Sequence, residues 1–144
     1  MLLQRPDPIS GGLNSCHHRY TQVINVLDHY IKEVLKYQYM ISIKDIRDFI
    51  QNENYEFYNH ALTEAKKDGV EPEDIVYVLL TGKIIERYTR RYRVLVYGTM
   101  LNGLPLHVMC DYSDKEVVYI PTVYIPSDDG WMNNYQCRKK GRKE

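Results

Sequence analysis

The sequence predicts an α+β fold in which N-terminal helices pack on one face of a small antiparallel sheet of three to four strands. Up to Gly82, apolar residues recur at three- and four-residue spacing, which is the period of amphipathic helices. After Gly82, apolar and polar residues alternate in short runs, which is the period of strands. Asn102-Gly103 separates two of these runs and is a strong hairpin signal. Because consecutive hairpins make neighbouring strands antiparallel, the helices are left to cover one face of the sheet.

Residues 1–41 are interpreted as an N-terminal extension that carries one amphipathic helix. Its first part, to about residue 18, is rich in Pro and Gly and predicts a loose leader. A helix is expected from Tyr20 to about Tyr39, because its apolar residues form one stripe. The stripe consists of Val23, Ile24, Leu27, Tyr30, Ile31, Val34 and Leu35. It could pack on the rest of the protein, or it could form a surface for homo-oligomerisation or for capture of a partner.

Three shorter helices are expected in residues 42–131, the main α+β domain. Ser42 begins a capping-box pattern, and Asn59 could cap the next helix, which Gly69 would end. Pro72 suits the first position of a further helix that stops at Gly82. The expected helices cover residues 43–50, 60–67 and 73–80.

Four strands are expected after Gly82, followed by a polar tail. The tail from residue 132 to 144 contains a run of Arg and Lys and is predicted to be a disordered, solvated segment rather than an RNA contact. The expected strands cover residues 84–88, 92–101, 104–112 and 117–125.

The strand pattern also predicts a register, if Asn102-Gly103 and Asp114-Lys115 are both two-residue loops. Gly98 then falls opposite His107, and His107 falls opposite Thr122. The face expected to pack under the helices carries Leu95, Tyr97, Leu101, Leu104, Leu106, Val108 and Cys110. The other face is expected to carry Gly98, His107, Asp111, Thr122 and Tyr124 among Val94, Val96, Met100 and Ile120. Because Gly98 has no side chain, this face would form a notch beside His107 that suits a phosphate or a nucleotide.

Composition limits the classes of function that are expected of the protein. Nineteen basic residues balance nineteen acidic ones, so no global field would draw the protein to nucleic acid. Three widely spaced cysteines indicate neither a disulfide framework nor a zinc site. No cofactor and no metal are expected. The chain has no apolar run long enough for a membrane and no secretion signal, which favours the cytoplasm.

Several short motifs follow one another in a characteristic order. The chain contains His60-Ala61 at a helix start, Gly103-Leu104-Pro105-Leu106-His107 on a strand, Thr122-Val123-Tyr124 and then Trp131. This order resembles a bacterial domain-of-unknown-function family whose members start a helix with His-Ala, carry Gly-x-Pro-x-His on a strand and close with Thr-Val-Tyr-x-Pro and a Trp. The resemblance covers residues 43–131, about two thirds of the chain.

Many members of this family are encoded beside a zinc-finger antitoxin and look like relatives of the RelE and MqsR type of RNA-cleaving toxins. The resemblance therefore implies the RelE/barnase-like toxin fold and an endoribonuclease that cleaves mRNA by metal-independent transesterification. The chain departs from the family pattern at three positions. Asp68 replaces an Arg before the helix-ending Gly, Tyr58 replaces a small residue, and Pro121 predicts a bulge or an edge in the last strand.

Metal-free RNA cleavage needs a group to activate the 2′-hydroxyl and an acid for the leaving 5′-oxygen. The candidate catalytic residues are His60, His107, Thr122 and Tyr124. A histidine suits either role because its pKa is near neutral. A lone strand histidine is also a common hydrogen-bonded structural residue, and His60 could be a packing residue at its helix start.

A second group of residues suits RNA binding. Arginines interleaved with tyrosines can hold phosphates and stack on unpaired bases. The same composition is also typical of a solvated turn. The candidate RNA-binding residues are Arg87, Tyr88, Arg90, Arg91 and Arg93.

Two functions are therefore expected to compete. The first is the toxin-like endoribonuclease, with RNA as its substrate and a zinc-finger-type antitoxin as its regulator. The second is a catalytically silent RNA- or protein-binding module on the same fold, which the zero net charge and Asp68 favour. The clustering of His107, Thr122 and Tyr124 on one face favours the enzyme.

Overall fold

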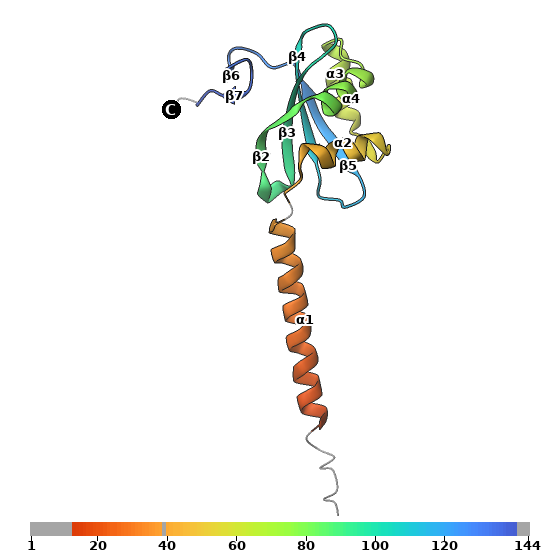
Figure 1. Cartoon of the computed structure of the whole chain (residues 1–144), viewed down its shortest axis with the longest axis vertical. Coiled ribbons are helices and arrows are strands. Elements are labelled where there is room, and N and C mark those ends of the chain that lie inside the picture. The colour runs from red at the N-terminus through yellow and green to blue at the C-terminus, as the bar shows by residue number, and fades with distance from the viewer. Residues whose placement is uncertain (1–12, 39, 141–144) are drawn as a thin grey trace, which may run out of the picture. The chain divides into compact units, whose positions relative to one another are not determined.

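The computed structural model describes residues 13–38 and 40–140, and within the first range the side chains of residues 22–35 (Figure 1). The chain divides into two compact units between residues 39 and 40. The first unit contains helix α1 (Leu13–Gln38), and the second contains all other elements. No helix among these residues is long and apolar enough to cross a membrane.

Helix α1 begins earlier than the sequence predicted. A loose leader was expected to about residue 18, but the helix already starts at Leu13. Gly11 and Gly12 are followed by a stretch without Gly or Pro, so the helix can extend back to the residue after Gly12. The remaining part of the expected leader, residues 1–12, lies outside the described residues. The apolar stripe is exposed: Ile24, Leu27 and Ile31 each retain 52–53% of their accessible surface.

The second unit has the predicted α+β class, but its sheet is larger than expected and mixed. It contains five strands in the order β1-β5-β4-β3-β2, of which β1 runs parallel to β5 and the others are antiparallel. Strand β1 was missed because three residues are too short for a period to be recognised. The strands are β1 (Tyr55–Phe57), β2 (Lys83–Tyr88), β3 (Arg93–Thr99), β4 (Pro105–Asp111) and β5 (Val118–Tyr124).

Three helices precede and connect the strands: α2 (Ile43–Gln51), α3 (Asn59–Lys67) and α4 (Pro72–Thr81). The predicted capping box of α2 is confirmed, because the Asp45 amide donates to Ser42 Oγ at 3.1 Å and the Ser42 amide donates to Asp45 Oδ2 at 2.8 Å. Asn59 is not the cap of α3. The Tyr58 amide donates to the carbonyl of Ile120, which keeps residue 58 extended and starts the helix directly after it.

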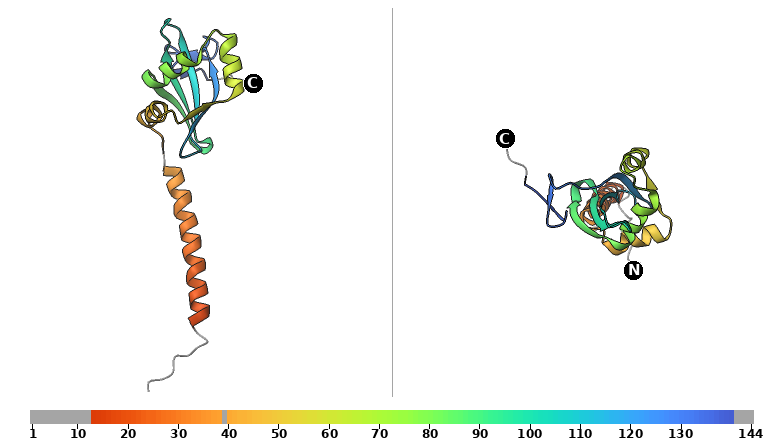
Figure 2. Two further views of the ribbon diagram at one scale, coloured as in Figure 1. Left: turned by 90° about the vertical axis from the view of Figure 1, so that its right-hand side faces the viewer. Right: turned by 90° about the horizontal axis from the view of Figure 1, so that it is seen from above.

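The helices lie on one face of the sheet, where the main core sits (Figure 2). Small side chains of α3 and larger aliphatic side chains of α4 pack there against alternate residues of the central strands. Large or branched residues fill the layer from both sides. Its fully buried members include Ala61, Ile75, Val78, Leu79, Val94, Val96, Leu106, Val108, Cys110 and Ile120.

The register of the β3–β4 hairpin differs by one residue from the prediction. The Met100 amide donates to the Leu104 carbonyl at 2.9 Å, and Gly103 lies in the left-handed region with φ of +85°. The loop thus contains three residues rather than the two of Asn102-Gly103, and the extra residue shifts every pair. Tyr97 is the residue opposite His107, while Gly98 lies opposite Leu106.

The predicted notch is therefore wrong. A one-residue shift moves β3 side chains to the opposite face of the sheet. Gly98 faces the helices, where a Cβ atom would lie 2.8 Å from Cγ1 of Val78. Its missing side chain thus allows α4 to approach β3 and leaves no space beside His107.

The last long strand contains the irregularity that Pro121 predicted. The pairing of β4 and β5 shifts between Met109 and Asp111, opposite the segment that contains Pro121. His107 pairs with Tyr124, and Thr122 pairs with Met109. Since this register differs from the predicted one by two residues, Thr122 keeps its face but is not the direct neighbour of His107.

The chain after β5 forms a hairpin, where the sequence predicted a disordered tail from residue 132. Strands β6 (Trp131–Met132) and β7 (Cys137–Arg138) pair antiparallel. Trp131 is buried and Arg138 forms an ion pair with β2, so tertiary contacts order a segment whose composition is that of a solvated tail. The end of the basic run, residues 141–144, lies outside the described residues.

Candidate functional site

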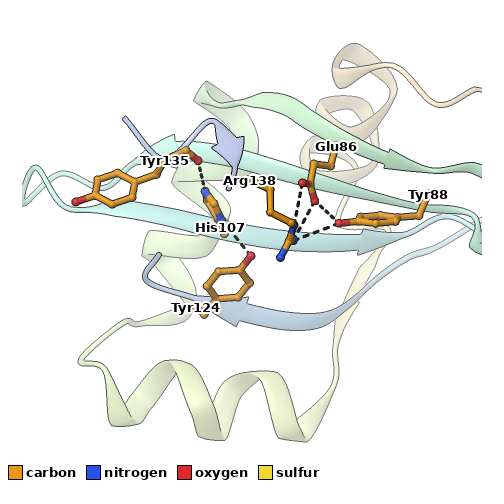
Figure 3. A network of polar contacts seen from close by, with 6 residues as sticks. All are labelled: Glu86, Tyr88, His107, Tyr124, Tyr135 and Arg138. Atoms are coloured by element: carbon orange, nitrogen blue, oxygen red, sulfur yellow. Dashed lines mark hydrogen bonds and ion pairs between the residues drawn. The ribbon is translucent and has the colours of Figure 1, made fainter. Parts of the chain in front are cut away.

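His107 lies on the face of the sheet opposite the helices, buried among a cluster of polar side chains (Figure 3). Its side chain is 0% exposed. Nδ1 lies 3.1 Å from Tyr124 Oη, and Nε2 lies 2.8 Å from the carbonyl oxygen of Tyr135. Because a carbonyl can only accept, a neutral imidazole carries its proton on Nε2 and accepts the Tyr124 hydroxyl proton at Nδ1.

Aromatic rings surround this imidazole. Trp131, Tyr124 and Tyr97 meet it edge to face, with ring centroids 4.3, 5.1 and 5.9 Å away. Burial lowers the pKa of His107, although the Tyr135 carbonyl and the Glu86 carboxylate act in the opposite direction. The ring is therefore held in its neutral form.

An ion pair borders the imidazole on the side of β2. Glu86 accepts two bonds from Arg138, at 3.1 Å from Nε and 3.1 Å from Nη2, and a third from the Tyr88 hydroxyl. The guanidinium also lies over the Trp131 ring, 4.6 Å from its centroid. Burial raises the pKa of Glu86, but the bonds from Arg138 and Tyr88 outweigh it, so the carboxyl stays ionised.

Of the four predicted catalytic residues, the structure brings two into contact. His107 and Tyr124 are hydrogen-bonded neighbours. Thr122 lies on the same face two residues before Tyr124 in β5, and its side chain is exposed. His60 is exposed on α3, a helix that packs through Ala61 on the other side of the sheet.

The five predicted RNA-binding residues do not form one surface. Arg87 pairs with Val94 on the helix side of the sheet and donates to the Ile41 carbonyl at 2.6 Å. On the opposite side, Arg93 donates to Asp111 at 3.0 Å and Tyr88 donates to Glu86. Arg90 and Arg91 lie on the short helix η1 (Thr89–Arg91), between β2 and β3 in the chain, and their side chains are exposed.

The prediction from sequence missed Glu86, Trp131, Tyr135 and Arg138 as members of the His107 cluster. Only Trp131 carried a signal, because it belongs to the motif order that resembles the family. Arg138 was assigned to the solvated tail by its neighbours in sequence. Across residues 13–38 and 40–140, no group of three or more His, Cys, Asp or Glu side chains is placed to hold a metal ion.

The buried imidazole predicts acid sensitivity of the fold. The pKa of His107 is lower in the folded protein than its ordinary 6.5, so below that pH the unfolded chain binds a proton that the folded protein does not. Stability should fall as the pH drops from 6.5 toward the folded pKa, by up to about 1.4 kcal/mol per pH unit. Urea unfolding at pH 7.5 and 5.5 measures this, and His107→Gln should reduce the pH dependence. An equal dependence in the variant would contradict the assignment.

In the comparisons with known proteins, a family model matches a segment that contains only some of the residues around His107. No curated protein and no solved structure matches the chain. His107, Tyr124 and Glu86 lie inside the matched segment, whereas Trp131, Tyr135 and Arg138 follow it. The segment from residue 57 to 125, which holds α3, α4 and strands β2 to β5, matches the model of the family described as Domain of unknown function (DUF4258).

Proposed function

We propose that the protein is a toxin-like endoribonuclease that cleaves mRNA by metal-independent transesterification. The observation that carries this proposal is the hydrogen bond between His107 Nδ1 and Tyr124 Oη, on the sheet face that the helices leave uncovered. Such a pair holds two proton-transfer groups in a fixed geometry, which is what general acid–base catalysis requires. The order of the motifs that contain both residues supports the assignment to RNA.

The reaction follows from the chemistry of the pair. The base is the other tautomer, with the proton on Nδ1 and directed at Tyr124, which forms once the Tyr135 carbonyl has released Nε2. In that form the imidazole presents the Nε2 lone pair as a base for the ribose 2′-hydroxyl. The 2′-oxygen then attacks the adjacent phosphorus, and the bond to the 5′-oxygen breaks. Tyr124, whose pKa is raised by burial, keeps its proton and can donate it to the leaving 5′-oxygen. The products carry a 2′,3′-cyclic phosphate and a 5′-hydroxyl.

Incubation of the purified full chain with mixed RNA in EDTA tests this function. We expect fragments with 2′,3′-cyclic phosphate ends, because the proposed mechanism uses no metal. A parallel reaction with ribosomes and mRNA covers an activity that needs translation. Absence of cleavage in both reactions, with a folded protein, would contradict the proposal.

A second candidate is a catalytically silent RNA- or protein-binding module on the same fold. It is favoured by the complete burial of His107 and by the use of both ring nitrogens in hydrogen bonds. Arg90 and Arg91 could then serve as exposed contacts for phosphates. RNA binding that is weakened in an Arg90→Gln, Arg91→Gln double variant, without cleavage by any variant, would support this module.

Two partners are proposed with the enzyme. The first is a zinc-finger-type antitoxin that holds the activity in check, which co-expression would test through relief of toxicity. The second is another copy of the chain, joined through the exposed apolar stripe of α1. Two such stripes can bury each other as in a coiled coil. Mass measurement in solution should give a dimer for the full chain and a monomer after Leu27→Lys; a monomeric wild type would contradict self-association.

A further inference from the structure

We propose that the C-terminal hairpin, residues 131–138, is a displaceable lid that switches the His107–Tyr124 pair off. The proposal rests on the proposed function, because it concerns access to the same site. In the structure the lid is closed. The proposal adds an open state, in which the lid has left the sheet and the imidazole is accessible to RNA.

The hairpin occupies the position that a substrate would need. Trp131 is 5% exposed and its ring lies 4.3 Å from the imidazole. From the hairpin loop, the Tyr135 carbonyl contacts Nε2 at 2.8 Å (Figure 3). Together with the sheet, these two contacts leave His107 with no exposed surface, so RNA cannot reach Nε2 while the hairpin is in place.

The same contact selects the inactive tautomer. Because the Tyr135 carbonyl accepts from Nε2, the proton sits on that atom and Nδ1 accepts from Tyr124. An imidazole in this form has no lone pair on Nε2 to accept the proton of a ribose 2′-hydroxyl. Removal of the carbonyl allows the proton to move to Nδ1, where Tyr124 Oη can accept it. The lid therefore blocks both access and proton transfer.

The attachment of the lid combines the buried Trp131 ring with a charged contact that is partly exposed. Its charged contact joins Arg138 to Glu86, with side chains 53% and 21% exposed. Solvent and salt weaken ion pairs of this kind. A phosphate group accepts the same two parallel bonds from a guanidinium as a carboxylate does, so an RNA backbone can compete with Glu86 for Arg138.

The loop of the hairpin is strained in the closed position. Asn133, Asn134 and Tyr135 all lie in the left-handed region, with φ of 53°, 53° and 64°. Asn tolerates this region well, whereas a Tyr rarely adopts it. The strained residue is thus the one whose carbonyl holds His107. Each strand contains two residues, so pairing within the hairpin adds little stability of its own.

The hairpin is separate from the five-stranded sheet that carries the catalytic pair. The matched segment ends at residue 125, after the strand that carries Tyr124 and before the hairpin begins. The catalytic pair and Glu86 thus belong to the matched domain. The covering residues lie in a separate segment that can leave without breaking the sheet.

The test uses the full chain and two readouts of lid opening that do not depend on catalysis. Trp131 is the only Trp of the chain, so acrylamide quenching of its fluorescence measures the exposure of the lid. Acylation of His107 by diethyl pyrocarbonate, followed by peptide mass spectrometry, measures access to the imidazole. Arg138→Gln should raise both rates roughly two- to five-fold. Lys140→Gln removes the same charge two residues after the hairpin and should leave both rates unchanged.

A second variant should act in the opposite direction. Tyr135→Asn relieves the left-handed strain and retains the backbone carbonyl, so we expect His107 acylation to fall about two-fold or more. RNA cleavage should rise in Arg138→Gln and fall in Tyr135→Asn. Wild-type rates of His107 acylation in Arg138→Gln would overturn the lid. Equal cleavage by all variants, despite changed access, would also overturn it. Changed access with no cleavage by any variant would leave the cover established and refute the ribonuclease instead.

Discussion

Replacing His107 with Gln is expected to slow RNA cleavage by about 10²- to 10⁴-fold, the usual loss when a general base is removed. Gln is preferred to Ala because its amide can still accept from Tyr124 and donate to the Tyr135 carbonyl, so neither group is left buried without a partner. The loss should appear in kcat more than in KM, since the imidazole acts on the reacting proton. Single-turnover cleavage in EDTA gives the rate, and circular dichroism checks the fold.

His60→Gln is the matched control for this experiment. It makes the same exchange at the other histidine of the predicted pair, which is exposed on the helix side of the sheet. We expect cleavage within about two-fold of the wild type, because a residue beyond the sheet cannot touch a substrate at His107. A full rate in His107→Gln would place the chemistry elsewhere or reveal a contaminating nuclease. A large loss of cleavage in His60→Gln would refute the placement of His60 and His107 on opposite sides of the sheet.

The helices could be predicted from sequence because their signals are local. Ser42 and Asp45 bond to each other across three residues, and Gly69 adopts the left-handed conformation that ends α3. The strand β1 could not be predicted in this way. It has three residues, and it is held by parallel pairing with β5, more than sixty positions later in the chain.

The register shows how one local detail changes the interpretation of a site. Asn102-Gly103 is compatible with a two-residue loop, and the three-residue loop that forms differs from it by one hydrogen bond, from Met100 to Leu104. Because of that difference, Gly98 faces the helices, and Tyr97 lies beside His107 where the sequence predicted Gly98. The pairing of His107 with Tyr124 required in addition a bulge near Pro121, whose presence the sequence indicated but whose size it did not.

The hairpin that covers His107 could not be predicted from sequence, because tertiary contacts and not local ones order it. A segment such as Cys137-Arg138-Lys139-Lys140 is indistinguishable in composition from a solvated basic tail. Its fold depends on Glu86, fifty-two positions earlier, and on the packing of Trp131 against His107. The same contacts distinguish Arg138 from the arginines of η1, which lie on an exposed turn despite their aromatic neighbours.

An alanine at position 82 is expected to cause the largest loss of stability among the glycine substitutions, about 3 kcal/mol in the free energy of unfolding. Gly82 joins α4 to β2, and a Cβ atom there would lie 2.4 Å from the carbonyl oxygen of Tyr97 and 2.6 Å from that of Val78. Both neighbours are backbone atoms, one in a central strand and one in a helix, so neither can move without breaking hydrogen bonds. Arg47 also donates to the Gly82 carbonyl at 3.0 Å, which holds the residue in place.

Alanine substitutions at two further glycines are expected to cause smaller losses of stability. At Gly98 the added Cβ would meet Cγ1 of Val78 at 2.8 Å, and a side chain can rotate or shift, so Gly98→Ala should cost less than Gly82→Ala. At Gly130 no atom lies within 4 Å of the added Cβ, and Gly130→Ala should change stability by less than about 0.5 kcal/mol. Urea unfolding of the three variants measures the series. Equal stability of Gly82→Ala and Gly130→Ala would show that the backbones of α4 and β3 do not approach residue 82 this closely.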